Sequence, residues 1–413
     1  MRSEDVVLLF CSTGTLKTRG RQLYADEGKD RDMQACWGKN TNVYATNEGH
    51  VFVRSPSLIK IPGYTFVHYW RFPTQLLLAR FIGAHVVDNL LARGLRVRVA
   101  VRNLAKGAAL RDARPHYASK LDCVLIADFA EATSLEEAVA GVDGIVHVAS
   151  PLTYCVQDNE KDIILPAING VKSVLKAAAN APQIRRIVIT SSFASVIDVN
   201  RRAPPHFTYT AADWNPLTYE EAADSKTSGV VAYRGSKKFA ELAAWEFMEK
   251  ENPTFDLVTL CPPMVFGPFV HPMARLEDLN DSAAKVWEVA SGADPMPVAR
   301  VPLWVDVRDL AQAHVEALLR PQVGNRRFTV ASPERFSYQK AAEIIVREFD
   351  WGKSRVCQSN AKQEIDKSYD LDGATAAREL GITYRSFQQS VVDFVIQAVG
   401  LEASQKGGER SGI

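Results

Sequence analysis

The sequence predicts an α/β fold built on a parallel sheet that helices cover on both faces. From Gln75 onward, short apolar runs alternate with helical segments, and this alternation is typical of β–α–β units. The runs are continuously apolar, as expected for strands that are buried on both faces. The chain has 413 residues, of which 46% are hydrophobic and 23% charged. It is therefore long and apolar enough for a large core.

The first predicted helix, Phe81–Arg93, has five apolar residues on one face: Ile82, Val86, Val87, Leu90 and Leu91. The strands expected after it are Val97–Val101, Leu121–Ile126, Gly144–Ala149, Arg186–Ser191 and Asp256–Leu260. A long helix is expected at Ile163–Ala179, and another around Tyr233. Strands and helices that alternate in this way predict a doubly wound parallel sheet.

The alternation becomes less regular after Cys261. Further elements are expected there: the strand Val301–Val307, the helix Leu310–Leu319 with Asp309 as its N-cap, the strand Arg326–Ala331, and the helices Gln339–Phe349 and Ser386–Val399. We therefore predict a Rossmann-like dinucleotide-binding domain at residues 76–261. A smaller C-terminal substrate lobe follows at 262–405, with segments that return to the sheet, and a polar tail at 406–413.

Residues 1–75 differ from the rest because they show little helical or strand periodicity. We predict an atypical, poorly ordered leader there, with Leu76–Leu78 as the stub of the first strand. An alternative is that Val6–Phe10 supplies a surrogate first strand, with Gly14 near the middle-glycine position. We disfavour it because Cys11 and Lys17 stand where other glycines of a phosphate-binding turn would be, and because no helix follows directly.

The turn that would cradle a cofactor pyrophosphate is largely missing. Gly83 stands where the last glycine of a G-x-x-G-x-x-G turn would be, but Leu78-Ala79-Arg80 runs directly into Phe81. Such a turn aims backbone N–H groups at the pyrophosphate from the N-terminus of a helix. Arg80 could contact a phosphate, but a side chain does not replace a preorganised loop.

The composition excludes several classes of function. A net charge of +1 indicates neither a nucleic-acid partner nor an anionic membrane surface. The six cysteines form no Cys-x-x-Cys pair, and the 8 histidines form no ligand cluster, so no metal site is expected. No apolar run is long enough to span a bilayer. The cytoplasm is the default expectation, and the oligomeric state is not predicted.

Tyr233 and Lys237 are spaced to carry reductase chemistry. On a helix, residues four apart share a face. A nearby ammonium favours the tyrosinate, so the tyrosine can give its proton to a carbonyl oxygen. Ser192 ends the apolar run 187–192 and could hydrogen-bond the same oxygen. A Tyr-x-x-x-Lys pair also occurs by accident in a chain with 12 tyrosines, but a serine-ended strand just before that helix makes chance a weaker explanation.

Two cations follow the strand Val97–Val101. In a dinucleotide fold, the adenosine ribose lies at the end of the second strand, where an acid would favour a free 2′-hydroxyl. Arg102 and Lys106 instead suit a 2′-phosphate, and so NADPH; the alternative is a solvated basic helix start. His147, inside a predicted strand, is expected to be packed near the cofactor rather than to act as a catalytic base.

From about Phe81 to Val399, the chain resembles the extended short-chain dehydrogenases/reductases of the NAD-dependent epimerase/dehydratase superfamily. Within them it resembles the dihydroflavonol-reductase-like and fungal methylglyoxal-reductase-like ketone and aldehyde reductases. The matching segments are residues 81–87, 97–103, 127–129, 146–151, 189–196, 232–241, 262–268 and 304–311. Each segment alone has low specificity, but the set is specific.

The resemblance implies that Ser192, Tyr233 and Lys237 are the catalytic residues. It places Arg102 and Lys106 at the 2′-phosphate of NADPH, Asp128 and Phe129 beside adenine, and Val148, Ala149 and Ser150 along the ribose. It also places Pro262 to Val265 near the nicotinamide. Cys261 departs from the pattern, because relatives often have asparagine there.

The resemblance implies an NADPH-dependent reduction of a ketone or aldehyde to an alcohol, with secondary metabolism as its setting. A sugar-nucleotide epimerase or dehydratase remains the alternative, because it shares Tyr-x-x-x-Lys. A third hypothesis is a non-catalytic relative that cannot bind cofactor without the glycine turn. Residues 1–79 match no part of the family, and a mis-assembled reading frame, such as a wrong first exon or a missed splice site, would account for them.

Overall fold

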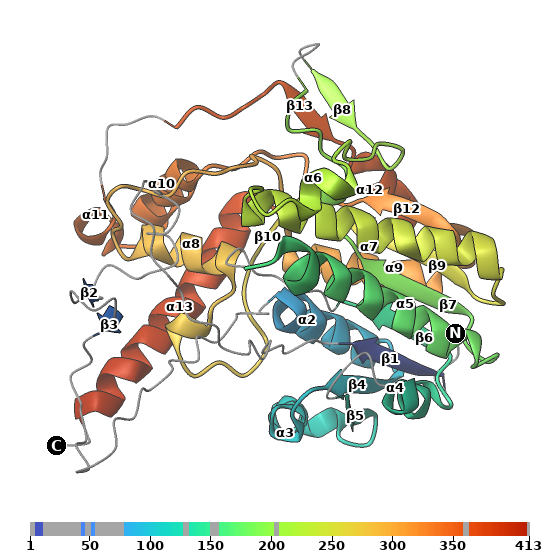
Figure 1. Ribbon diagram of the computed structural model, residues 1–413. Helices are drawn as coiled ribbons and strands as arrows, with labels where there is room; N and C mark the ends of the chain where they lie inside the picture. The colour runs from blue at the N-terminus through green and yellow to red at the C-terminus, as the bar shows by residue number, and fades with distance from the viewer. Residues whose placement is uncertain are drawn as a thin grey trace, which may run out of the picture. The chain divides into compact units, whose positions relative to one another are not determined.

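We describe the fold from a computed structural model of the chain (Figure 1). The described residues are 5–10, 43–45, 51–53, 78–126, 132–148, 157–201, 206–357 and 363–410. Within them no helix is both long and apolar enough to cross a membrane. By their contacts, Met1–Gly14 and Gln75–Ile413 form one compact unit, and Thr15–Thr74 form another.

The first unit is built on a seven-stranded sheet in which every neighbouring pair of strands is parallel. Its strands are β1 (Val6–Phe10), β4 (Arg96–Val101), β5 (Leu121–Leu125), β6 (Gly144–His147), β7 (Arg186–Thr190), β9 (Asp256–Cys261) and β12 (Arg326–Thr329). Their order across the sheet is β12-β9-β7-β6-β1-β4-β5. This is the doubly wound order 3-2-1-4-5-6 with a seventh strand added, so the predicted Rossmann-like fold is confirmed.

Strand β1 is the clearest correction to the sequence analysis. Val6–Phe10 lies between β4 and β6, with Val7 opposite Val97 on one side and opposite Gly144 on the other. The surrogate strand that we disfavoured is therefore the true first strand. The proposed stub at Leu76–Leu78 is wrong, because Leu78 begins helix α2 (Leu78–Ala92), while Leu76 and Leu77 lie outside the described residues.

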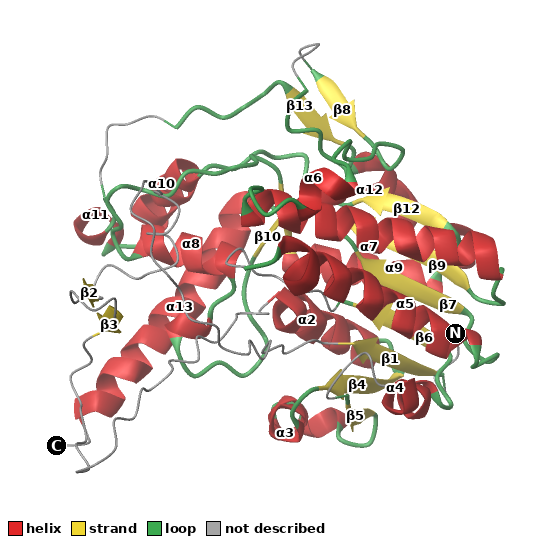
Figure 2. Cartoon of the chain, viewed as in Figure 1, coloured by secondary structure: helices red, strands yellow, loops and turns green. Residues whose placement is uncertain are grey.

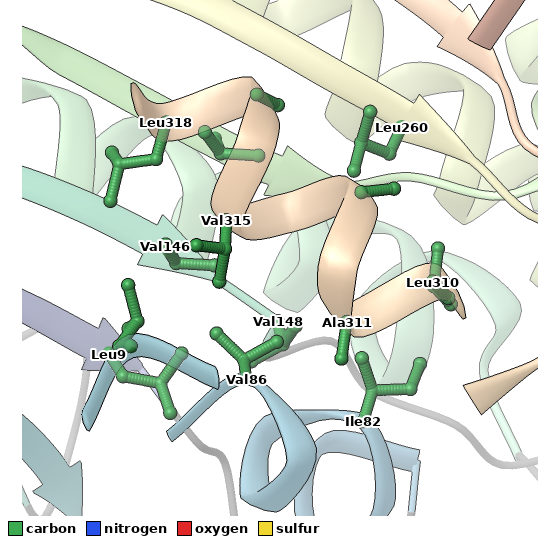
Figure 3. Packing of buried hydrophobic residues seen from close by; sticks show 14 of the residues in the cluster. Leu9, Ile82, Val86, Val146, Val148, Leu260, Leu310, Ala311, Val315 and Leu318 are labelled. Carbon is green, nitrogen blue, oxygen red and sulfur yellow. The ribbon is translucent and has the colours of Figure 1, made fainter. Parts of the chain in front are cut away.

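Alternate side chains of β1 enter two different cores, as the strand period of two requires. Val7 and Leu9 belong to the cluster that α2 and α9 (Val307–Leu319) cover. Figure 3 shows Leu9 close to Val86, Val146 and Val315 in that cluster. Leu8 joins the cluster on the opposite face of the sheet. A central strand that is buried on both faces explains why residues 6–10 are continuously apolar.

Helices cover both faces of the sheet (Figure 2). Residues of α2 and α9 line one face, and residues of α4 (Ala132–Val139), α5 (Leu165–Ala179) and α7 (Gly229–Glu251) line the other. The remaining helices of this part are α3 (Leu104–Asp112), α6 (Tyr219–Ala223) and α12 (Ala374–Leu380). Because all neighbouring strands are parallel, their carboxyl ends lie at one edge of the sheet, where such folds bind ligands.

A smaller apolar cluster forms the C-terminal lobe. It packs α8 (Asp281–Ala290), α10 (Tyr338–Glu348) and α13 (Phe387–Arg410) around the two-stranded sheet of β10 (Met264–Phe266) and β11 (Trp304–Asp306). Two further short elements are α11 (Gly352–Arg355) and the parallel pair of β8 (Phe207–Tyr209) with β13 (Tyr369–Leu371).

The start of α9 differs from the prediction. Asp306 is its N-cap, with a side chain that accepts a hydrogen bond from the Arg308 backbone N–H at 2.8 Å. Asp309, the predicted cap, lies in the first turn and binds the backbone N–H of Arg385 at 2.7 Å. The helix therefore begins one turn earlier than its apolar pattern indicates.

The second unit, Thr15–Thr74, is described at two strands, β2 (Val43–Ala45) and β3 (Val51–Val53), which pair antiparallel. Val43 is opposite Val53 in this hairpin. We predicted a poorly ordered leader at residues 1–75. Apart from residues 5–10, 43–45 and 51–53, this range lies outside the described residues.

Candidate active site

Tyr233 and Lys237 lie on one face of α7, near its N-terminus. The Lys237 Nζ is 5.8 Å from the centroid of the Tyr233 ring. Lys237 is buried and Tyr233 is half-buried. Burial lowers the pKa of Lys237 to about 8, although Glu241 and Cys261 act in the opposite direction. An ammonium held this close to a tyrosine ring can stabilise the tyrosinate.

The two serines after β7 point to different surroundings. Ser191 is buried and donates a hydrogen bond to the Glu241 carboxylate at 2.5 Å. Ser192 is half-buried and is the N-cap of a short 3-10 helix, Phe193–Ser195, where its Oγ accepts from the Ala194 N–H at 3.1 Å. The more accessible of the two hydroxyls is thus the one predicted to meet the substrate, a role that stays a prediction.

The sequence analysis missed a buried carboxylate, Glu241, that lines the same cavity as Lys237 and Ser191. Glu241 follows Lys237 by four residues on α7 and forms an ion pair with Arg327, whose Nε is 2.8 Å from its Oε1. The spacing of Tyr233, Lys237 and Glu241 was the available signal, since residues four apart share a helix face. The partner Arg327 comes from β12 and could not be found from local pattern.

The predicted cofactor edge is formed by the ends of β4 and β6. Arg102 comes directly after β4, and Lys106 is exposed in the first turn of α3. The intervening residues 103–105 include no acid. Val148 is buried directly after β6. The strand order reverses between β1 and β6, which is where doubly wound folds bind nucleotides. Two cations without an acid fit the 2′-phosphate of NADPH.

The other predicted cofactor contacts lie on three elements. Gly83 is buried in α2, and Val265 is buried in β10. Pro262 follows β9, and its carbonyl accepts a hydrogen bond from the Phe193 N–H at 2.8 Å. This bond ties the predicted nicotinamide segment to the serine turn. Four predicted contacts lie outside the described residues: Asp128, Phe129, Ala149 and Ser150.

Two buried groups near Lys237 stay neutral. Burial, together with the nearby Lys237 charge, lowers the pKa of His147 to about 3. Burial raises the pKa of Cys261 to about 12, with the Glu241 charge acting in the same direction. A neutral, buried His147 in strand β6 agrees with the expectation of a packed residue rather than a base.

A parallel sheet with this order and a Tyr-x-x-x-Lys pair beside its carboxyl edge defines a nucleotide-dependent oxidoreductase or epimerase class. Residues 79–320 match the 3-beta hydroxysteroid dehydrogenase/isomerase family. The chain belongs to this family, which is part of the extended short-chain dehydrogenase/reductase group. The relatives that it resembles include fungal NADPH-dependent carbonyl reductases.

The relatives include ketoreductase azaE of Aspergillus niger, which is 35% identical over 76% of this chain and 94% of its own length. The NADPH-dependent methylglyoxal reductase GRE2 of Saccharomyces cerevisiae is 29% identical over 78% of this chain and 96% of its own length. The crystal structure of Gre2 with NADPH from Candida albicans superposes with a TM-score of 0.69, at 31% identity over 78% of this chain and 96% of that chain.

The match covers almost the whole of the relative but a smaller share of this chain. Gre2 of Candida albicans is matched over 96% of its length, yet only 78% of this chain takes part. About a fifth of this chain therefore has no counterpart in a relative that is itself almost fully matched. The family match begins at residue 79, so the residues before it lie outside that match.

Proposed function

We propose that the chain catalyses the NADPH-dependent reduction of a ketone or aldehyde to an alcohol. The observation that carries the proposal is the Tyr233–Lys237 pair on α7, with Ser192 in the turn after β7. The family and the names of its relatives support the same class of reaction. We attribute the choice of the particular carbonyl to the C-terminal lobe.

Each residue of the proposed site has one task. NADPH, when bound, supplies the hydride. Tyr233 donates its hydroxyl proton to the carbonyl oxygen, and Ser192 donates a hydrogen bond to the same oxygen as negative charge develops. The Lys237 ammonium stabilises the tyrosinate that remains. Arg102 and Lys106 hold the 2′-phosphate by charge-assisted hydrogen bonds.

The cofactor assignment predicts a selective loss of NADPH affinity. Arg102→Ala with Lys106→Ala should weaken NADPH binding at least tenfold, which is about 1.4 kcal/mol. NADH binding should change little, because NADH lacks the 2′-phosphate. Fluorescence titration of the reduced nicotinamide measures both affinities.

The matched control is Arg96→Ala with Lys120→Ala. These exposed cations lie at the amino-terminal ends of two strands, Arg96 at the start of β4 and Lys120 directly before β5, whereas Arg102 and Lys106 follow the carboxyl end of β4. The control removes the same net charge and should leave the ratio of NADPH to NADH affinity unchanged. Equal losses for both cofactors in the Arg102/Lys106 variant would contradict the assignment.

The proposed reaction is tested by consumption of NADPH with a panel of carbonyl compounds. Methylglyoxal, a ketone and a cinnamoyl thioester follow the activities named for relatives, including cinnamoyl-CoA reductase CAD2 of Medicago truncatula. We expect methylglyoxal or the ketone to give alcohol in equal amount to the NADPH consumed, whereas reduction of the thioester would give aldehyde and free thiol. The assay uses NADPH up to millimolar concentration, because the phosphate-binding turn is interrupted in this sequence.

A non-catalytic protein is the second candidate, and a specific observation favours it. Between β1 and α2, residues 11–77 replace a connection that is usually 2–6 residues long. If NADPH does not bind at millimolar concentration, the chain as it stands is not a reductase. An epimerase or dehydratase would instead convert a sugar nucleotide with no net consumption of NADPH.

A further inference from the structure

The buried carboxylate of Glu241 has no task in the reaction described above. Glu241 is 2% exposed and lies one helical turn after Lys237. Both side chains line the same cavity, of about 20 Å³. Removing a carboxylate from water costs several kcal/mol unless other groups compensate for the lost hydration, so its compensating contacts are informative.

One set of contacts joins Glu241 to the turn that carries Ser192. The Glu241 Oε2 accepts hydrogen bonds from Ser191 Oγ at 2.5 Å and from Ser195 Oγ at 2.6 Å. These two hydroxyls flank Ser192 in the sequence. The turn is held on its other side by Asn215, whose side-chain amide donates to the Ala194 carbonyl at 2.9 Å. A carboxylate that binds both flanking serines fixes the direction in which Ser192 projects.

The second set of contacts keeps the carboxylate charged. Arg327 donates from Nε to Oε1 at 2.8 Å and from Nη2 to Oε2 at 3.2 Å. Its guanidinium lies 3.7 Å from the centroid of the Trp214 ring and donates to the Ala211 carbonyl at 2.9 Å. Burial alone would raise the pKa of Glu241, but Arg327 and the two serines hold it below its ordinary value.

We propose that Glu241 is a positioning residue for the reduction: its carboxylate keeps the Lys237 ammonium charged and fixes the turn that presents Ser192 to the carbonyl oxygen. The catalytic consequence rests on the proposed function. The effect on Lys237 does not, because it follows from the arrangement of buried charges alone.

The groups around Lys237 leave Glu241 as its counter-charge. Among the residues that the structure describes, the titratable groups that face the ammonium are Tyr233 and Glu241 on its own helix, Cys261 on β9 and His147 on β6. The pKa of Cys261 is raised to about 12 and that of His147 is lowered to about 3, so both are uncharged near neutral pH. Arg327 lies beyond Glu241 and pairs with it. Glu241 thus stabilises the protonated form of Lys237.

The test titrates Lys237 in the full chain without cofactor. Lysines labelled with ¹³C at Cε report the protonation of their ammonium groups by NMR, and Lys237→Met identifies the Lys237 signal. Glu241→Gln should lower the titration midpoint of Lys237 by about one pH unit or more, as expected for loss of a buried opposite charge that lines the same cavity. The sign follows because removing the anion disfavours the charged lysine.

Two control variants separate electrostatics from damage to the fold. Arg327→Lys alters the same buried ion pair but keeps a cation beside Glu241, so the carboxylate stays charged and the Lys237 midpoint should change little. Glu246→Gln removes an exposed acid from the same helix, whose side chain is 57% exposed, and should change nothing. An unchanged midpoint in Glu241→Gln, or an equal fall in Arg327→Lys, would overturn the proposal.

Turnover gives the second readout. The pKa of about 8 for Lys237 predicts that activity falls as the pH rises through that value. In Glu241→Gln this falling limb should move to lower pH by the same amount as the NMR midpoint, while Glu246→Gln keeps the wild-type profile. If the NMR midpoint moves but the falling limb of the pH–activity profile does not, the part of the proposal that concerns catalysis is wrong. Absence of turnover in every chain would contradict the proposed function and leave the NMR result standing.

Discussion

Deleting Thr15–Arg80, so that Gly14 directly precedes Phe81, is expected to tighten NADPH binding at least about a hundredfold. This joined chain would contain Gly14-Phe81-Ile82-Gly83, which restores the last two glycines of G-x-x-G-x-x-G between β1 and α2. The turn would supply two or three backbone N–H donors to the pyrophosphate. Each charge-assisted bond contributes about 1.5–3 kcal/mol, and about 1.4 kcal/mol corresponds to a tenfold change in affinity.

The prediction depends on the position of β1. Because Val6–Phe10 already lies in the centre of the sheet, the joined chain needs no new strand. Its connection from β1 to α2 would have the length usual in α/β units. Fluorescence titration with NADPH measures the gain in affinity.

Two variants serve as controls for the deletion. Removing only Thr15–Thr74, the second compact unit, leaves six residues between Gly14 and Phe81 and should not restore tight binding. Gly14→Val in the joined chain should reverse the gain, since a branched side chain keeps the pyrophosphate from approaching the backbone. If the shorter deletion binds NADPH as tightly as the joined chain, the glycine spacing is not the cause.

Replacing Tyr233 with phenylalanine should lower kcat by about 10²–10⁴-fold in the joined chain. This is the usual contribution of a positioned general acid. Tyr233 is half-buried and no packing atom is lost except the hydroxyl, so the fold and NADPH affinity should be retained. Steady-state kinetics with saturating NADPH measure the change.

Tyr117→Phe is the matched control for this substitution. Tyr117 is a partly buried tyrosine packed against the core at the edge of the sheet near β5. It loses the same hydroxyl far from α7 in sequence and should keep the activity of the joined chain. Wild-type turnover in Tyr233→Phe would refute the assignment of the proton donor.

The sheet from Val97 onward was predictable because each strand is a short apolar run and each helix has an apolar face. The first strand was not predictable, because recognising it depends on the short connection that normally leads from such a strand to its helix. Val6–Phe10 is apolar, but a strand is assigned to a β–α–β unit by the helix that follows it. Here 67 residues, 11–77, separate β1 from α2, so local pattern favoured Leu76–Leu78.

The candidate site was predictable to the extent that it is local in sequence. Tyr233 and Lys237 share a helix, and Arg102 follows a strand, so their positions in the sequence are enough to identify them as candidate site residues. Glu241 was missed because a buried carboxylate is expected only where a cation pairs with it, and that cation, Arg327, is 86 residues away in sequence. Asp306 was missed as the cap of α9 because it ends a buried strand, where an acid gives no helical pattern.

The position of β1 also bears on the hypothesis of a mis-assembled frame. A wrong first exon would leave residues 6–10 without a place in the fold, yet they pair on both sides with the sheet. An interruption inside the chain, between Gly14 and Phe81, fits the structure better. The transcript sequence across the codons for both residues is the direct check of this interpretation.

The proposed reductase is tested most directly by following the transferred hydrogen. NADPH that carries deuterium at both positions of C4 of the nicotinamide is incubated with the full chain or the joined chain and a reactive carbonyl. We expect one deuterium on the carbinol carbon of the alcohol for each NADPH consumed, with the faster reaction in the joined chain and almost none in its Tyr233→Phe variant. Alcohol without the label, or NADPH that binds tightly but is never consumed with any carbonyl, would contradict the assignment.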